Sequence, residues 1–204
     1  MLGPYFPNYV NAIEQLTEKL ERAANSVSAS GRVGYFREKL ERCPTGQKHF
    51  SQYESIGIEM WQYVFPTALG SPNTQQSTFD RVHRRDVLFR NHRESRFWQR
   101  VADRYAADTI IVDFKNDGKP VPGTTMKEVE SYANKALGRL IFVVSRRGAA
   151  KSFKPAQVST YNARDTVVLV ISDNQMLEMV SRKEKGEQPE DLLEDILEDF
   201  LYSV

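Results

Sequence analysis

The sequence predicts an α/β domain preceded by a short helical extension. Three apolar runs, over residues 109–115, 140–144 and 166–171, indicate buried strands. Segments with the apolar spacing of helices stand before, between and after these runs. Strands that alternate with helices are typical of a sheet covered by helices. A chain of 204 residues is long enough for one sizeable core, or for one domain with a small appendage.

The first 48 residues are the predicted extension, and the α/β domain is expected over residues 49–204. Asn8 can cap a helix over residues 9–20, and a second helix is expected over residues 35–43. The turn that follows begins at Pro44. This pattern leaves three roles open for the extension: a packing arm, a dimer contact or the end of a longer linker.

The next elements lead into the first apolar strand. Residues 50–65 carry apolar side chains on one helical face and predict a core helix. A loop or an irregular hairpin tip rich in Gly, Pro, Ser, Thr and Gln is expected over residues 69–80, and a short strand over residues 86–89. A helix over residues 94–107 then precedes the strand at residues 109–115.

Beyond that strand, the Gly- and Pro-rich residues 116–123 predict a protruding loop. Thr125 and Glu128 match a capping box, so a helix is expected from there to Gly138. Glu128 is thereby assigned a structural role. The strand at residues 140–144 leads into a basic segment for which no helix is predicted.

The last third of the chain begins with the strand at residues 166–171. Asp173 or Asn174 is expected to cap a short helix after it, and a terminal helix is expected to start near Pro189. The many acids of the terminal helix are expected to form its solvated side.

Composition and charge bound the classes of function. A net charge of +1, with 40% hydrophobic and 27% charged residues, describes an ordinary globular protein. Basic residues gather over residues 81–104 and 139–154, so a nucleic acid would be bound by local patches. The single cysteine, Cys43, excludes a disulfide framework and a cysteine-rich zinc site. With neither a secretory leader nor an apolar run of about 20 residues, we expect a cytoplasmic protein that does not enter a membrane.

The strongest chemical signal is the pair Asp113 and Lys115 at the end of an apolar strand. Two residues apart on a strand, they project from the same face. A carboxylate beside an ammonium suits metal-assisted phosphodiester chemistry. The alternative is an accidental pair at a solvated strand end, worth about 0.5 kcal/mol.

Two further acids stand at corresponding places in the predicted order. Glu59 lies on the core helix at the border of its apolar face, and Asp86 begins a strand. Three acids and one lysine that converge on one sheet edge would form a divalent-metal site. Glu54, on the same helix, is an open alternative to Glu59.

This order of motifs resembles that of the PD-(D/E)xK nuclease superfamily. The pieces are Glu59 in the segment Gly-Ile-Glu-Met, Asp86 in Arg-Asp-Val-Leu-Phe, and the run Val-Asp-Phe-Lys-Asn at residues 112–116. A helix and a strand follow over residues 127–144. The resemblance covers residues 50–172, with a looser likeness to restriction-type and phage-defence nuclease domains.

The resemblance implies a restriction-endonuclease-like three-layer fold, in which a mixed central sheet is flanked by helices. The sequence departs from the family pattern in two places. Arg85 stands where a proline commonly precedes the strand acid, and Asp113 replaces the more common glutamate.

The resemblance also implies the roles of the site residues. Asp86 and Asp113 would bind Mg²⁺, with Mn²⁺ as a substitute, together with the backbone carbonyl of Phe114. Glu59 would complete the site. Lys115 would orient the attacking water or stabilise the transition-state oxygens.

Basic residues near these motifs are candidates for contacts with the phosphate backbone, although for each of them taken singly a solvated surface role is the favoured alternative. They are Arg84, Arg85, Arg90, Arg146, Arg147 and Lys151.

The first hypothesis is therefore a Mg²⁺-dependent nuclease acting on DNA in restriction, phage defence or mobile-element biology, as a homodimer or within a larger defence assembly. A second is a catalytically weak nucleic-acid-binding or assembly module that uses the N-terminal helices as its partner contact. A third is a structural α/β protein whose Asp-x-Lys triplet is accidental. DNA versus RNA and endo- versus exonucleolytic action stay open.

Overall fold

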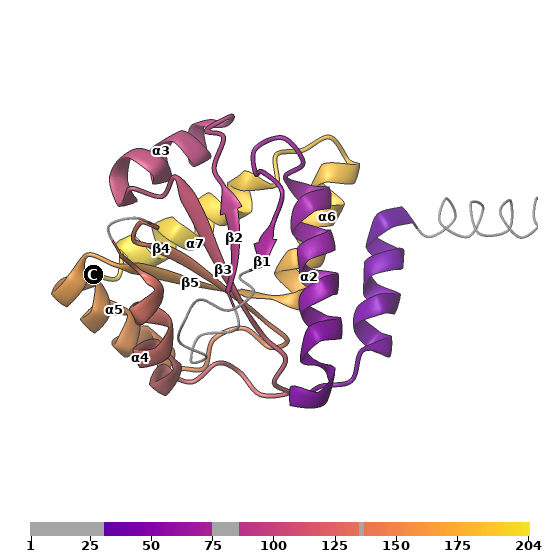
Figure 1. Ribbon diagram of the computed structural model, residues 1–204, viewed down its shortest axis with the longest axis horizontal. Coiled ribbons are helices and arrows are strands. Elements are labelled where there is room, and N and C mark those ends of the chain that lie inside the picture. The colour runs from indigo at the N-terminus through magenta and orange to yellow at the C-terminus, as the bar shows by residue number, and fades with distance from the viewer. Residues whose placement is uncertain (1–30, 75–85, 135–136) are drawn as a thin grey trace, which may run out of the picture.

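In the computed structural model, which describes residues 31–74, 86–134 and 137–204, a mixed sheet of five strands lies between layers of helices (Figure 1). The α/β fold class with a mixed central sheet is therefore confirmed. The predicted helix over residues 9–20 lies outside the described residues, as do Arg84 and Arg85. Within the described part of the chain, no helix is long and apolar enough to cross a membrane.

The sheet has the strand order β1-β2-β3-β4-β5. Its strands are β1 (Asn73–Thr74), β2 (Asp86–Arg90), β3 (Thr109–Lys115), β4 (Leu140–Ser145) and β5 (Val167–Ser172). β1, β2 and β3 pair antiparallel, whereas β3, β4 and β5 pair parallel. The carboxyl ends of the three parallel strands consequently meet at one edge of the sheet.

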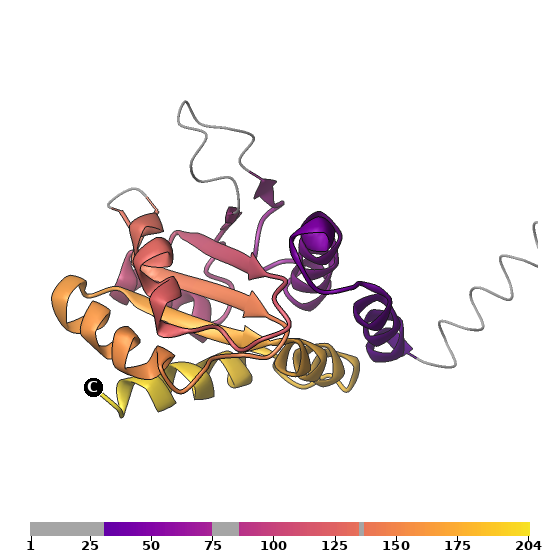
Figure 2. The same ribbon diagram turned by 90° about the horizontal axis from the view of Figure 1, so that it is seen from below.

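Two apolar clusters cover the two faces of the sheet. The larger one joins the helical residues 31–42 with the helices α2 (Phe50–Val64), α3 (Arg96–Tyr105), α6 (Asp173–Glu184) and α7 (Glu190–Leu201). The smaller one joins α4 (Met126–Val129) and the start of α5 (Phe153–Arg164) with the opposite face. Figure 2 shows the sheet between these layers.

The strands β2 to β5 and the helices α2, α3, α6 and α7 follow the predicted pattern, whereas β1 lies in the segment 69–80 that was predicted as a loop or hairpin tip. β3 coincides with the predicted strand, and all of its residues except Thr109 are buried. The apolar residues predicted to face inward from α3, among them Phe97, Trp98 and Val101, are buried in the core. The local sequence pattern was sufficient to predict these two elements, because α3 has one strongly apolar face and the residues of β3 are buried on both faces.

The helix α5 was missing from the sequence prediction, although the parallel pair β4 and β5 requires a crossover connection. Among its described residues only Phe153 and Thr160 are buried. A helix that buries so little apolar surface shows almost no amphipathic pattern, so periodicity could not reveal it.

Two predicted helix caps are wrong. In the described residues, the Thr125 side chain accepts no capping hydrogen bond, and the helix after it turns into 3₁₀ geometry that ends at Tyr132. At α6 the cap is Ser172 rather than Asp173 or Asn174. The Ser172 side chain accepts from the Gln175 backbone, and the Gln175 side chain accepts from the Ser172 backbone N–H.

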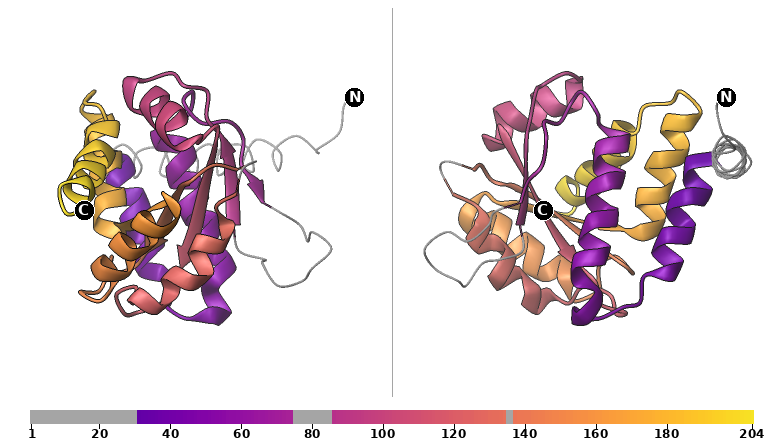
Figure 3. Two further views of the ribbon diagram at one scale, coloured as in Figure 1. Left: turned by 90° about the vertical axis from the view of Figure 1, so that its left-hand side faces the viewer. Right: turned by 45° about the vertical axis from the view of Figure 1, so that its right-hand side comes forward.

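The part of the N-terminal extension that the structure describes packs on the domain. Phe36, Leu40 and Cys43 are buried in the larger core cluster, and the Phe36 ring lies 5.8 Å from the ring of Tyr63 on α2. Figure 3 shows the helical residues 31–42 on the same side of the molecule as α2 and α6. Of the three roles left open, the structure shows the packing arm for these residues.

Candidate active site

A three-residue ion-pair cluster lies at the carboxyl end of β3. The Lys115 Nζ is 2.9 Å from Asp113 Oδ2 and 3.2 Å from Glu128 Oε1. Asp113 is 0% exposed and Lys115 is 8% exposed, whereas Glu128 reaches solvent. The alternation of β3 directs Asp113 and Lys115 to the face covered by α4, where Glu128 occupies the first turn. The predicted Asp–Lys pair therefore forms and is buried.

The charges of this cluster favour a protonated lysine. Burial lowers the pKa of Lys115, but the carboxylates of Asp113 and Glu128 outweigh that effect and raise the pKa above its ordinary value. Tyr132 Oη lies 3.4 Å from Glu128 Oε1, one helical turn further along. Lys115 is thus a fixed positive charge at neutral pH, shared by two acids.

Glu128 is the member of the cluster that sequence reasoning missed. Its position in a Thr-x-x-Glu motif explained it as a helix cap, yet its carboxylate contacts Lys115. The sequence offered one signal for Glu128. A lysine at the end of a buried strand is stabilised by carboxylates on the elements that pack against that strand, and the helix after β3 carries Glu128. The sequence alone does not show which residue of the helix faces the strand.

Asp86 is placed by the pairing of β2 with β3. It is the Cα partner of Asp113 in the antiparallel ladder. The two strand acids that were predicted to share a site are thus direct neighbours across two strands.

The helix acid Glu59 is not brought to this cluster. Glu59 Oε2 lies 2.6 Å from Lys39 Nζ, and Glu59 Oε1 accepts a hydrogen bond of 2.8 Å from Tyr35 Oη. Both partners belong to the helical residues 31–42. The helix that carries Glu59 and Glu54, α2, packs on the face of β3 that presents Phe114, opposite to the face of Lys115.

The predicted phosphate-binding arginines occupy different environments. Arg90 is exposed at the end of β2 that pairs with Thr109, four residues and about 13 Å from Asp86. Arg146 is almost fully buried, and its guanidinium bonds to groups within the protein. Arg147 and Lys151 are exposed in the connection after β4. Because β4 runs parallel to β3, that connection starts at the sheet edge where Lys115 lies.

A pocket of about 680 Å³ opens beside Lys115. Its other lining residues belong to the connection after β3, from Asp117 to Thr125. Val121 fixes this wall, because its N–H donates to the Gly148 carbonyl at 2.8 Å and its carbonyl accepts from the Ala150 N–H at 2.9 Å. The predicted protruding loop is therefore attached to the connection after β4.

Comparisons with known proteins give limited similarity. No family model matches the chain. The chain is 25% identical over 122 residues to the putative transposon gamma-delta 80.3 kDa protein of Escherichia coli (strain K12). That match covers 60% of this chain but only 17% of the relative.

Among solved structures, the chain is similar to the restriction endonuclease FokI bound to DNA. The likeness has 13% sequence identity and a TM-score of 0.48, and it covers 76% of this chain and 30% of that one.

Proposed function

We propose that this protein is a metal-dependent nuclease that hydrolyses phosphodiester bonds of DNA, on a fold of the restriction-endonuclease type. The observation that carries the proposal is the Lys115 ammonium held between the carboxylates of Asp113 and Glu128 at the carboxyl end of a central strand. Asp86, the cross-strand partner of Asp113, supports it. A phosphodiester nuclease needs acids for a cation and a positive charge for the phosphate at the same place.

The donor chemistry of the cluster fits a hard divalent cation. The part of the chain that the structure describes contains no group of three or more His, Cys, Asp or Glu side chains that could hold a metal ion without further ligands. The carboxylates of Asp113 and Glu128 nevertheless lie on either side of one positive charge, the Lys115 ammonium. Carboxylate and carbonyl oxygens are the ligands that Mg²⁺ prefers. Asp86, Asp113 and the Phe114 carbonyl would hold Mg²⁺ or Mn²⁺. When bound, the ion would acidify a water and offset the charge that develops on the phosphate.

The remaining roles belong to the chain itself. Lys115 stays protonated, so its ammonium can orient the attacking water or stabilise a phosphate oxygen. Glu128 holds the ammonium from the α4 side and is itself bonded to Tyr132. Arg147 and Lys151, exposed at the same sheet edge, are the described cations that we assign to the phosphate backbone.

The biological setting that we favour is a mobile element. The printed name of the relative from Escherichia coli connects that protein with a transposon. The chain spans less than a fifth of that relative, so a role in transposon biology is part of this proposal.

The test is cleavage of linear duplex DNA, supercoiled plasmid and RNA of matched length, with Mg²⁺, with Mn²⁺ and with EDTA. We expect DNA cleavage that requires the metal and that falls at least about 100-fold in Asp113→Asn and in Lys115→Met, because the metal ligand and the phosphate charge are lost. Circular dichroism and urea unfolding of each variant check that it is folded under the assay conditions.

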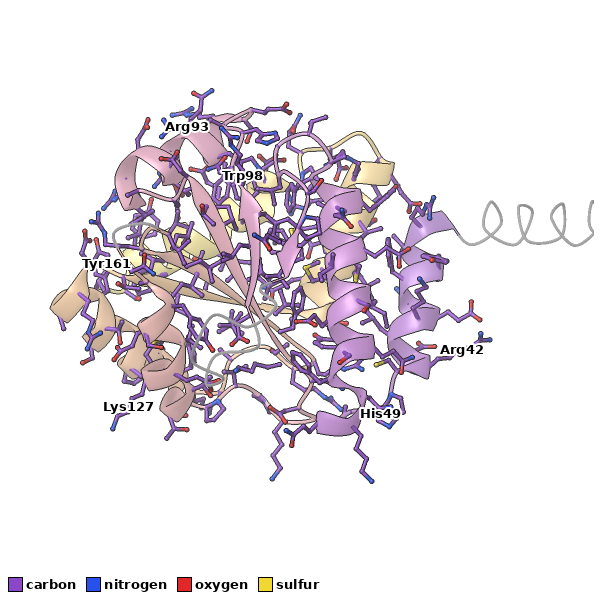
Figure 4. All side chains as sticks on the ribbon, in the orientation of Figure 1. Arg42, His49, Arg93, Trp98, Lys127 and Tyr161 are labelled. Atoms are coloured by element: carbon purple, nitrogen blue, oxygen red, sulfur yellow. The ribbon has the colours of Figure 1, made fainter. Side chains whose placement is uncertain are left out.

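Lys127→Met is the matched control for Lys115→Met. Lys127 is the exposed lysine next to Glu128, and Figure 4 shows it at the outer surface of the molecule. We expect this variant to cleave like the wild type. Full cleavage by folded Asp113→Asn would refute the proposal, and DNA binding without cleavage by the wild type would favour the binding-module alternative. Glu59→Gln tests whether Glu59 is the third acid of the site, as the sequence predicted. Because Glu59 contacts Lys39 and Tyr35 instead, we expect unchanged cleavage.

A further inference from the structure

The β3–β4 ladder is extended by two side chains just beyond the candidate site. Its last paired residues are Lys115 and Ser145. The residues that follow them, Asn116 and Arg146, are joined through their side chains, since Arg146 Nε donates to Asn116 Oδ1 at 2.8 Å. Asn116 is 4% exposed. A part-buried hydrogen bond therefore joins the two chain segments just after Lys115 and Ser145 end their strands.

The same two side chains hold the end of the N-terminal helical segment. Arg146 donates from Nη1 to the Leu40 carbonyl at 2.9 Å and from Nη2 to the Cys43 carbonyl at 2.6 Å. These carbonyls belong to the last turn of helical residues 31–42 and the residue after it, where a cation is favourable.

Asn116 continues this attachment along the following turn. Its Nδ2 donates to the carbonyls of Pro44, at 3.0 Å, and Gly46, at 3.1 Å. Its own carbonyl accepts from the Gly46 N–H at 2.7 Å. Asn116, which directly follows β3, is thereby bonded to Arg146 after β4 and to the turn at residues 44–46. We call these two residues with the carbonyls of Leu40, Cys43, Pro44 and Gly46 the Asn116–Arg146 clamp.

The other side of Arg146 is also engaged. Its Nη1 lies 3.3 Å from Asp173 Oδ2, and its guanidinium stacks 4.3 Å from the centre of the Tyr53 ring. Tyr53 Oη in turn donates to Asp173 Oδ1 at 2.7 Å. This second set of contacts fixes the guanidinium against α2 and α6, so the clamp connects the extension to the domain through a rigid group.

The position of the clamp has a consequence for Lys115. Strand ends open more readily than strand centres because they have fewer hydrogen bonds to lose. Lys115 is the last ladder residue, and the pocket wall after it begins at Asp117. Gly118 in that wall approaches Thr45, so that a Cβ atom there would be 3.5 Å from Thr45 Oγ1. Residues 40–46 thus support both Lys115 and the wall beside it.

We propose that Asn116 and Arg146 are positioning residues of the active site, and that they make residues 40–46 part of the machinery that places Lys115. The catalytic part of this inference rests on the proposed nuclease function. The structural part does not, because the clamp can be tested through the opening of the end of β3.

The experiment uses the full chain with Arg146→Lys, which keeps the charge near Asp173 but cannot reach all four acceptors. Asn116→Ser is the milder second variant, which removes the two donors to the turn. Amide hydrogen exchange followed by NMR measures how readily the end of β3 opens in each folded protein, at Phe114, Lys115 and Asn116 and at the Gly46 N–H that donates to the Asn116 carbonyl. We expect these amides to exchange at least about 10-fold faster in both variants, because a strand end that has lost side-chain hydrogen bonds opens more readily.

Cleavage kinetics supply the second measurement. We expect kcat to fall about 10- to 100-fold while KM for DNA stays within about 2-fold, because a misplaced catalytic group affects the reaction more than binding. Arg37→Lys, an exposed arginine on the same helical segment, is the matched control and should change neither quantity.

The outcomes separate the two proposals. Unchanged amide exchange at the end of β3 in folded Arg146→Lys and Asn116→Ser would overturn the clamp, whatever the enzyme does. Faster exchange in both variants with no nuclease activity in the wild type would support the positioning of Lys115 and reject the nuclease. If Arg146→Lys does not fold, Asn116→Ser decides by the same measurement.

Discussion

At the scale of single residues, Lys115 neutralises a carboxylate that has no access to solvent. Asp113 is 0% exposed, and its Oδ2 is 2.9 Å from the ammonium. A buried charge of this kind is tolerated only with a partner of opposite charge. The pair therefore contributes to folding as well as to the proposed chemistry.

We predict that Lys115→Met lowers the free energy of unfolding by about 3 kcal/mol, because the buried Asp113 loses its counter-charge. The double variant Asp113→Asn/Lys115→Met should recover a large part of this loss, since it removes the uncompensated charge. Urea unfolding at pH 7 of the wild type, both single variants and the double variant measures the coupling. Strictly additive losses would show that the two side chains do not interact.

The pH dependence of that effect follows from the raised pKa of Lys115. A lysine whose pKa is higher in the folded state stabilises the protein below the unfolded-state pKa, about 10.4, and this contribution is lost as pH rises through the folded pKa. The destabilisation by Lys115→Met should therefore become smaller as the pH rises above about 10.5. A destabilisation that does not decrease above about pH 10.5 would assign the effect to another group.

At the scale of elements, the contact between α2 and β3 depends on a glycine. Gly57 lies in the middle of α2, where glycine costs about 1 kcal/mol relative to alanine. A Cβ atom at this position would lie 2.0 Å from the Phe114 ring. The absence of a side chain lets the helix approach the strand that carries Asp113 and Lys115.

We predict that Gly57→Ala destabilises the protein by about 1–3 kcal/mol, although the same change on an exposed helix would stabilise it. The reason is that α2 or the Phe114 ring must move to admit the methyl group. Thermal and urea unfolding measure the change, with Gln62→Ala on the exposed side of α2 as control. A stabilised Gly57→Ala would mean that the helix does not pack this closely.

At the scale of the whole molecule, the N-terminal segment shares the core of the domain. Phe36, Leu40 and Cys43 are buried with α2 and the sheet, and the clamp ties the same segment to β3 and β4. The domain boundary predicted at residue 48 therefore falls between two parts that are packed together in the described chain.

We predict that a chain of residues 49–204 is less stable than the full chain by several kcal/mol, because each fully buried apolar side chain contributes about 1.5–3 kcal/mol. Its urea midpoint should be clearly lower, and it should bind the dye ANS through newly exposed apolar surface. The full chain should unfold in one transition. An unchanged midpoint for the shorter chain would show that the predicted domain is energetically independent of its extension.

The sequence by itself determined the fold class, the positions of the strands β2 to β5 and the pair at the centre of the proposed site. The run at residues 109–115 begins with three consecutive apolar residues after Thr109, which indicates a buried strand, and alternation along a strand places Asp113 and Lys115 on one face. These are local properties of the chain. Asp86 was also found locally, because it begins a short apolar strand.

Only the tertiary structure decided which other side chains these residues meet. Whether an acid on a helix faces the sheet depends on how the helix is rotated against it, and that rotation placed Glu128 rather than Glu59 beside Lys115. The sequence predicted Arg146 as one of the surface residues that bind phosphate. In the structure it is enclosed by segments that are far apart in the sequence, since it contacts the Leu40 carbonyl and Asp173. The physical reason is that a local pattern specifies which face of a helix or strand is buried. Which side chains of two different elements contact each other depends on how these elements pack together in space, and the local pattern does not specify that packing.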